Sequence, residues 1–299
     1  MKNSLSCPLV SAVLLGACGG SAPVAEDTVE TVEVVEETSE FELGFEIELD
    51  PFIATAPETM SAVVTEVDPE TLVVPAPELP LVSQGFDLVL SEYVTDDGGF
   101  RYEALGENEE HSVLLASFLA DVADADLASM GDDARLAFLI NAYNAYTIAS
   151  VIELWPIDGV LEEDGFFDRR EHLVGGASMT LNTLENEHVR AAFGEPRIHF
   201  VVNCASTGCP WLSPEAITAD NLEMMLDRQS RAFVQRTTAL HGHAAGVSQI
   251  FDWFASDFDA SGGVRQFLVD HLDNERGDAL ENGRIDIEFF DYDWSVNAR

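Results

Sequence analysis

Apolar positions follow a helical period over most of the second part of the chain. Residues 86–93 and 112–122 are amphipathic, and a longer capped run over 132–154 is apolar nearly all round until Pro156 ends it. A helix with apolar residues on every side is typical of a buried position, so this run predicts the central helix of the fold. A further apolar stripe over 218–237 predicts a helix that packs against the same core.

Shorter runs predict a small β-sheet. Residues 198–202 are rich in β-branched and aromatic side chains and stop at a polar turn, which predicts a buried strand. Alternating apolar residues over 285–290 predict a second strand of that sheet, and Gly175-Gly176 within 171–179 predicts a hairpin. The predicted fold class is therefore α+β, a single and mostly helical domain around a small β-sheet.

The first eighteen residues have the pattern of an export signal. Lys2 precedes an apolar stretch that is too short to span a bilayer, and Leu15-Gly16-Ala17-Cys18 resembles the lipobox of bacterial lipoproteins, whose cysteine is lipidated. We therefore expect a lipoprotein-type signal peptide over 1–18 and a membrane anchor through lipid on Cys18. Because Gly19 follows the cysteine, we expect a cell-envelope protein in the outer membrane, facing the periplasm or the surface. A plain secretory peptide is the alternative.

Residues 19–80 carry sixteen acidic side chains and no basic one. Such a segment buries too little apolar surface to offset the entropy lost on ordering, so we expect an acidic disordered tether followed by a globular domain over 81–299. The whole chain has a net charge of -41, and Lys2 is its one lysine. Because so acidic a protein repels phosphate backbones, the charge argues against nucleic-acid partners.

Candidate chemistry gathers in the turn that follows 198–202. Asn203, Cys204 and Ser206 stand where a rigid scaffold holds a loop, which is a common place for binding and catalytic groups. The sequence has no Gly-rich phosphate loop, no Gly-x-Ser-x-Gly elbow and no zinc spacing, so it predicts no cofactor and no metal. His241-Gly242-His243 is interpreted as a surface loop.

Four segments carry a resemblance to a known family: ARLAFLINAYNAYTI at 134–148, TLNTLENEHVR at 180–190, RIHFVVNCASTGCP at 197–210 and FFDYDWSVN at 289–297. In this order they resemble the bacterial branch of domain-of-unknown-function family 547, over roughly residues 85–299. The family has no settled activity, so the resemblance implies a shared fold and a set of matching residues rather than a reaction.

The two cysteines of the expected domain, Cys204 and Cys209, are either a disulfide or a thiol with a bystander, because an envelope compartment is oxidising. A bridge over so short a loop contributes only about 2 kcal/mol by the loop-entropy model. It would also consume Cys204 as a nucleophile, so the structural and catalytic hypotheses exclude each other at that sulfur.

Three hypotheses for function remain. In the first, a hydrolase or acyl transferase uses Cys204 as nucleophile, with His199 or Glu185 tuning it, Arg197 favouring the thiolate, and Asn203 and Ser206 shaping the pocket. The second, a thiol–disulfide redox site, is disfavoured because two-residue cysteine spacing is absent. The third is a non-catalytic envelope domain that binds a peptide, a glycan or a protein and keeps a structural Cys204–Cys209 disulfide.

Three polar residues outside the turn have both a structural and a functional interpretation. Asn141 and Asn144 share one helix face, where they either hydrogen-bond backbone to fix the packing or line a pocket below Cys204. Glu185 has capping-box spacing from Asn182, so its carboxylate either caps a helix or faces the site.

Overall fold

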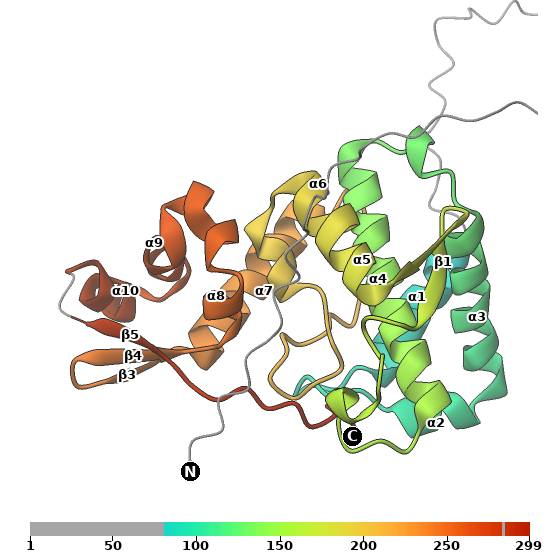
Figure 1. Ribbon diagram of the computed structural model, residues 1–299, viewed down its shortest axis with the longest axis horizontal. Helices are drawn as coiled ribbons and strands as arrows, with labels where there is room; N and C mark the ends of the chain where they lie inside the picture. Colours follow the sequence, from blue (N-terminus) through green and yellow to red (C-terminus); the bar gives the residue numbers. More distant parts are fainter. Residues whose placement is uncertain (1–80, 283–284) are drawn as a thin grey trace, which may run out of the picture. The chain divides into compact units, whose positions relative to one another are not determined.

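A computed structural model describes residues 81–282 and 285–299, all within one compact unit over 68–299. The expected signal peptide, Cys18 and the acidic segment over 19–80 lie outside the described residues. Within the described part, no helix is both long enough and apolar enough to span a bilayer. The fold is mostly helical with two small sheets, which confirms the α+β prediction (Figure 1).

The first half of the described chain is helical, and its helices pack around one apolar cluster. They are α1 (Leu81–Tyr93), α2 (Tyr102–Glu107), α3 (Glu109–Asp124), the short η2 (Leu127–Ser129), α4 (Asp132–Leu154) and the short η3 (Val160–Glu162). Helix α4 is buried on every side from Leu139 to Ile148. This confirms the predicted central helix, which ends before Pro156 because proline cannot continue it.

The predicted hairpin is confirmed. Strands β1 (Glu171–Val174) and β2 (Ala177–Thr180) pair antiparallel around Gly175 and Gly176, whose φ angles of 57° and 78° lie in the left-handed region that favours glycine. The backbone N–H groups of both glycines donate to carbonyls of α3, at 2.9 Å and 2.7 Å. The turn is therefore held against the helical half.

The segment after the hairpin begins two residues earlier than its sequence pattern predicts. It contains α5 (Leu181–Thr183), a π-helical stretch η4 (Leu184–Arg190) and α6 (Ala191–Phe193). Thr180 is the N-cap, since its Oγ1 accepts from the Thr183 N–H at 3.2 Å. The predicted capping box of Asn182 and Glu185 is wrong, because the competing hydroxyl of Thr180 caps first. The Glu185 carboxylate is thus available for other contacts.

Residues 198–202 do not form the predicted strand. They belong largely to a 3₁₀ turn, η5 (Pro196–Phe200), which starts where proline fixes φ and where Glu195 accepts from the Arg197 N–H at 2.9 Å. A strand would place Ile198 and Phe200 on one face. In the structure Ile198 joins the first apolar cluster and Phe200 joins a second one, and the helical turn is what lets the two side chains separate.

The second apolar cluster lies among the C-terminal elements, which Figure 1 draws in orange and red. These elements are α7 (Leu222–Thr237), β3 (Ala239–His241), β4 (Ala244–Val247), α8 (Ile250–Trp253), η6 (Ala255–Ser261), α9 (Gly263–His271), α10 (Asn274–Glu281) and β5 (Asp286–Phe289). The strand predicted over 285–290 is confirmed as β5, but its sheet has the order β3-β4-β5 and its parallel partner is β4 rather than 198–202.

The last nine residues return to the helical half and cross the 203–210 turn. Gly208 N–H donates to Asp293 O at 2.9 Å, and Thr207 N–H donates to Ser295 O at 2.8 Å. Further along, the Tyr102 hydroxyl donates to the buried Asn297 Oδ1 at 2.7 Å. These bonds fix the C-terminal segment, and Tyr292 with it, against the turn that contains Cys204.

Candidate functional site

The turn over 203–210 is held by side-chain bonds from within. The sulfurs of Cys204 and Cys209 form a disulfide, with their Cα atoms 6.3 Å apart. Asn203 Nδ2 donates to Pro210 O at 2.7 Å, and its Oδ1 accepts from Ala205 N–H at 2.8 Å. Ala205 has a φ of 61°, unusual for a residue with a Cβ, so the turn holds a strained backbone at this point.

Two hydroxyl groups contact the Cys204 sulfur. Ser206 Oγ lies 3.0 Å from Cys204 Sγ, and the Tyr292 hydroxyl lies 3.4 Å from it. Ser206 also donates to the Tyr292 hydroxyl at 3.0 Å. A Cβ on Gly208 would come within 2.9 Å of the Tyr292 ring, so the glycine allows the ring to lie directly on the turn. Burial raises the pKa of Tyr292, which keeps its hydroxyl protonated and able to donate.

A second polar group is built around His199. Its Nε2 lies 2.8 Å from Asp257 Oδ2, and Arg190 binds the same carboxylate through Nε at 2.9 Å and through a terminal nitrogen at 3.1 Å. The ring of Phe254 stacks on His199 at 4.1 Å and receives the Arg190 guanidinium at 4.4 Å. The bond to His199, ahead of the one to Arg190, holds the pKa of Asp257 well below its usual range.

Glu185 interacts electrostatically with residues of both groups. Burial raises its pKa, while the nearby charge of His199 and a hydrogen bond with the Tyr143 hydroxyl oppose the rise. The carboxylate in turn raises the pKa values of Tyr143 and Tyr292, after the larger effect of burial on each. Electrostatic contact therefore runs from the tyrosine beside Cys204, through Glu185, to His199 and Asp257. A carboxyl group with a raised pKa is suited to general acid–base chemistry.

Arg197, predicted to favour a Cys204 thiolate, is engaged elsewhere. Its guanidinium binds Glu195 at 2.8 Å and 2.7 Å and reaches Glu223 at 3.1 Å. The hydrogen bond that Arg197 donates to Glu195 raises the pKa of Arg197. Its charge is thus neutralised within its own ion-pair group.

Both predicted amides of α4 bind backbone. Asn141 exchanges two hydrogen bonds with Ile217, at 2.6 Å and 3.1 Å. Asn144 Nδ2 donates to Val201 O at 2.9 Å, and its Oδ1 accepts from Asn203 N–H at 2.8 Å. Asn144 therefore positions Asn203, the residue before Cys204, and has a supporting role in the turn.

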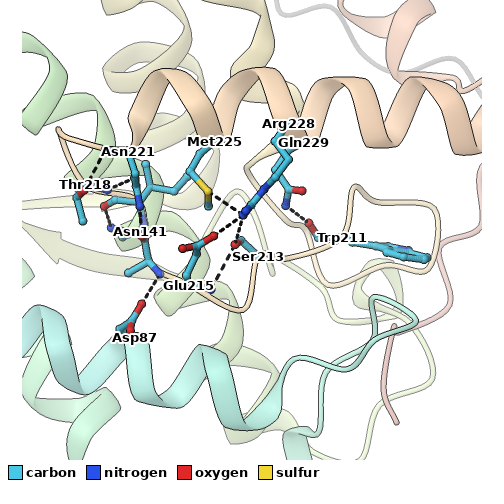
Figure 2. A network of polar contacts seen from close by, with 12 residues as sticks. Asp87, Asn141, Trp211, Ser213, Glu215, Thr218, Asn221, Met225, Arg228 and Gln229 are labelled. Carbon is cyan, nitrogen blue, oxygen red and sulfur yellow. Dashed lines mark hydrogen bonds and ion pairs between the residues drawn. The ribbon is translucent and has the colours of Figure 1, made fainter. Parts of the chain in front are cut away.

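Figure 2 shows the network that continues from Asn141 towards α7. Asp87 of α1 accepts from Ala216 N–H at 2.7 Å, and Arg228 of α7 donates to Glu215 at 2.6 Å and to Ser213 at 3.2 Å. The cavity that Asn141 and Asn144 help to line here is about the size of one water molecule. The network therefore fixes the loop before α7 to the helical half.

Comparison with known proteins adds one finding. Residues 127–234 match the model of a family described as "Protein of unknown function, DUF547". The chain carries a DUF547-like domain. The matched part of the DUF547-like domain contains Glu185, Arg190, His199 and the disulfide. It is narrower than the resemblance over 85–299, and Asp257 and Tyr292 lie outside it. No curated protein and no solved structure matches the chain.

Three members of the candidate site escaped sequence reasoning. Asp257 lies in a segment with no motif, and Tyr143 fits the apolar pattern of α4. Tyr292 stands in one of the resembling segments but was not singled out there. A tyrosine flanked by two acidic residues near the chain end was the only available signal, and its partner Ser206 is 86 positions away.

Proposed function

We propose that the domain is a hydrolase or acyl transferase whose nucleophile is the reduced Cys204 thiol. The observation that carries the proposal is the contact of the Tyr292 hydroxyl with Cys204 Sγ, at 3.4 Å. The charge of Glu185 adds to the effect of burial in raising the pKa of Tyr292. A hydroxyl that donates to a thiolate stabilises its charged form and lowers the thiol pKa. Hydrogen bonds from Tyr292 and Ser206 are therefore expected to activate the sulfur once the disulfide is open.

In this scheme a thiol reductant of the envelope first opens the Cys204–Cys209 bridge, giving up two electrons and two protons. The Cys204 thiolate then attacks the carbonyl carbon of an ester, thioester or amide, and the leaving group departs with a proton as a thioester forms on the enzyme. Glu185 accepts and releases the protons of these steps. His199, oriented by Asp257, tunes the pKa of Glu185 through its charge. Water or an acceptor then takes the acyl group, which restores the thiol.

Alkylation of the reduced protein tests this proposal. In a Cys209→Ser variant of the full chain, Cys204 is the sole cysteine of the domain, and its rate of reaction with iodoacetamide is followed against pH by peptide mapping. We expect an apparent pKa well below the usual thiol value of about 8.5. Tyr292→Phe in the same background should raise that pKa by about one unit, because the donor to the thiolate is lost.

The control is the reciprocal variant, Cys204→Ser, which leaves the buried Cys209 as the thiol and should react slowly at every pH. An ordinary pKa for Cys204 that Tyr292→Phe leaves unchanged would contradict the catalytic proposal.

A second candidate function is favoured by the disulfide itself. The bridge, with the two Asn203 bonds, ties off the turn as a structural loop of a binding domain would. In this alternative the domain binds a peptide, a glycan or a protein without chemistry. The oxidised protein, in which Cys204 has no free thiol, would then bind its ligand fully.

We further propose that the protein is held in the bacterial envelope, at the outer membrane, by lipid on Cys18. The support is the Leu15 to Cys18 pattern. Intact-mass analysis of the chain expressed in a suitable bacterial host should show a diacylglyceryl addition at Cys18. Cys18→Ser should move the protein from the membrane fraction to the soluble fraction, while Cys7→Ser should leave it at the membrane. A mature chain that starts elsewhere and lacks lipid would exclude the anchor.

A further inference from the structure

Three aromatic rings cluster beside the Cys204 turn, with Trp253 stacked on Trp294 and Tyr292 tilted against both. Trp253 of α8 lies 5.0 Å from Tyr292 and 5.6 Å from Trp294 between ring centroids, and the two residues of the C-terminal segment are 4.6 Å apart. Trp253 is 45% exposed, although it is a large apolar side chain. We call these three residues the aromatic face. An exposed indole packed against further aromatic rings is typical of a binding surface.

The aromatic face adjoins the candidate site through Tyr292. The Tyr292 ring belongs to the aromatic face, and its hydroxyl contacts Cys204 Sγ and Ser206 Oγ. The aromatic face and the sulfur therefore share Tyr292, so a ligand bound on the face would contact a residue that also contacts the sulfur.

Exposed carboxylates accompany the rings along the chain. Asp252 precedes Trp253, and Asp291 and Asp293 stand on either side of Tyr292. Within residues 81–282 and 285–299, no salt bridge involves any of these three carboxylates. Hydrogen bonds from Ser295 keep the pKa of Asp293 below its usual range, so it stays charged.

The chain elsewhere covers such rings with its own arginines. Arg236 lies 4.2 Å from the centre of the Trp211 ring, and Arg190 lies 4.4 Å from that of Phe254. Among the cation–π contacts of the described residues, none involves a ring of the aromatic face. It thus combines the ring and the negative charge that a cation prefers, and the described chain supplies no cation to it.

We infer that the aromatic face binds a cationic side chain, a guanidinium or an ammonium group, of a peptide partner. Charge complementarity carries this choice, since unpaired carboxylates beside an exposed indole attract a cation, whereas a net charge of -41 repels an anionic ligand. This inference rests on the proposed function in one respect, because it names the substrate class as peptides with a basic residue next to the reacting carbonyl.

Calorimetric titration of the oxidised full-length protein with N-acetyl-triarginine amide tests the inference. Trp253→Ala should weaken binding by about tenfold, because the ring face is lost while every carboxylate remains. Trp253→Phe should retain most of the affinity. The matched control is Trp211→Ala, which removes another exposed tryptophan, 39% exposed, outside the aromatic face and should change affinity less than about twofold.

Equal affinities in wild type and Trp253→Ala would overturn the inference, because they would mean that the acidic chain attracts the peptide diffusely. Tighter binding of a neutral N-acetylglucosamine trimer than of the peptide would also overturn it, in favour of a glycan surface. The two proposals fail separately. Binding to oxidised protein needs no thiol, and Tyr292→Phe alters the thiol while keeping the ring.

Discussion

Replacing Asp257 with asparagine is expected to lower the free energy of unfolding by about 3 kcal/mol, the cost typical of removing one partner from a mostly buried ion pair. The Asp257 carboxylate binds both His199, whose side chain is 1% exposed, and Arg190. The neutral amide would leave the guanidinium without its countercharge beside Phe254. Urea unfolding of the full-length protein at pH 7, followed by circular dichroism, measures the loss.

The pH dependence of that stability gives an independent check. Because the pKa of Asp257 is lower in the folded state than in the unfolded chain, the folded state binds fewer protons over this range. The stabilisation is present above the unfolded carboxyl value of about 3.9 and is lost as pH falls below it towards the folded pKa. Asp257→Asn should therefore flatten the acid limb of the stability curve.

Asp259 provides the matched control, since it is an exposed aspartate in the same segment, η6. Asp259→Asn should change the free energy of unfolding by less than about 0.5 kcal/mol. If Asp257→Asn behaved like this control, the His199–Asp257–Arg190 group would contribute nothing to stability, and its role in orienting His199 would lose its support.

Asn144→Leu is expected to be at least as damaging, with a loss of about 3 kcal/mol or more, because it leaves two backbone groups without their partner at about 1 to 3 kcal/mol each. These groups are the carbonyl of Val201 and the N–H of Asn203, both on buried residues. Because Asn203 begins the Cys204 turn, the variant should also loosen the turn, which hydrogen exchange at 201–205 would detect.

The control for this substitution is Asn182→Leu. Asn182 is exposed, and Thr180 rather than Asn182 caps its helix, so the change should cost less than about 0.5 kcal/mol. If Asn144→Leu lost as little stability as this control, water would have replaced the hydrogen bonds of the Asn144 side chain. A large loss of stability in Asn182→Leu would indicate that Asn182 caps the helix after all.

The candidate site was only partly predictable from the sequence. Cys204 was recognised because polar residues that end an apolar run stand out locally, and Glu185 because of its capping-box spacing from Asn182. The sequence left Glu185 open between a helix cap and the site and paired His199 with Cys204, whereas the structure places His199 against Asp257, 58 positions away. Such pairings depend on which elements pack together, and no local pattern records them.

The sequence by itself determined the parts governed by near neighbours: the span of α4, the Gly175-Gly176 turn and the family resemblance. Tertiary structure decided the rest. Residues 196–200 form a helical turn because Ile198 and Phe200 are buried in two separate apolar clusters. Tyr292 joined Cys204 because the chain end returns across the turn. Local hydrogen bonding and periodicity fix an element, but the burial of each side chain depends on surfaces that distant segments supply.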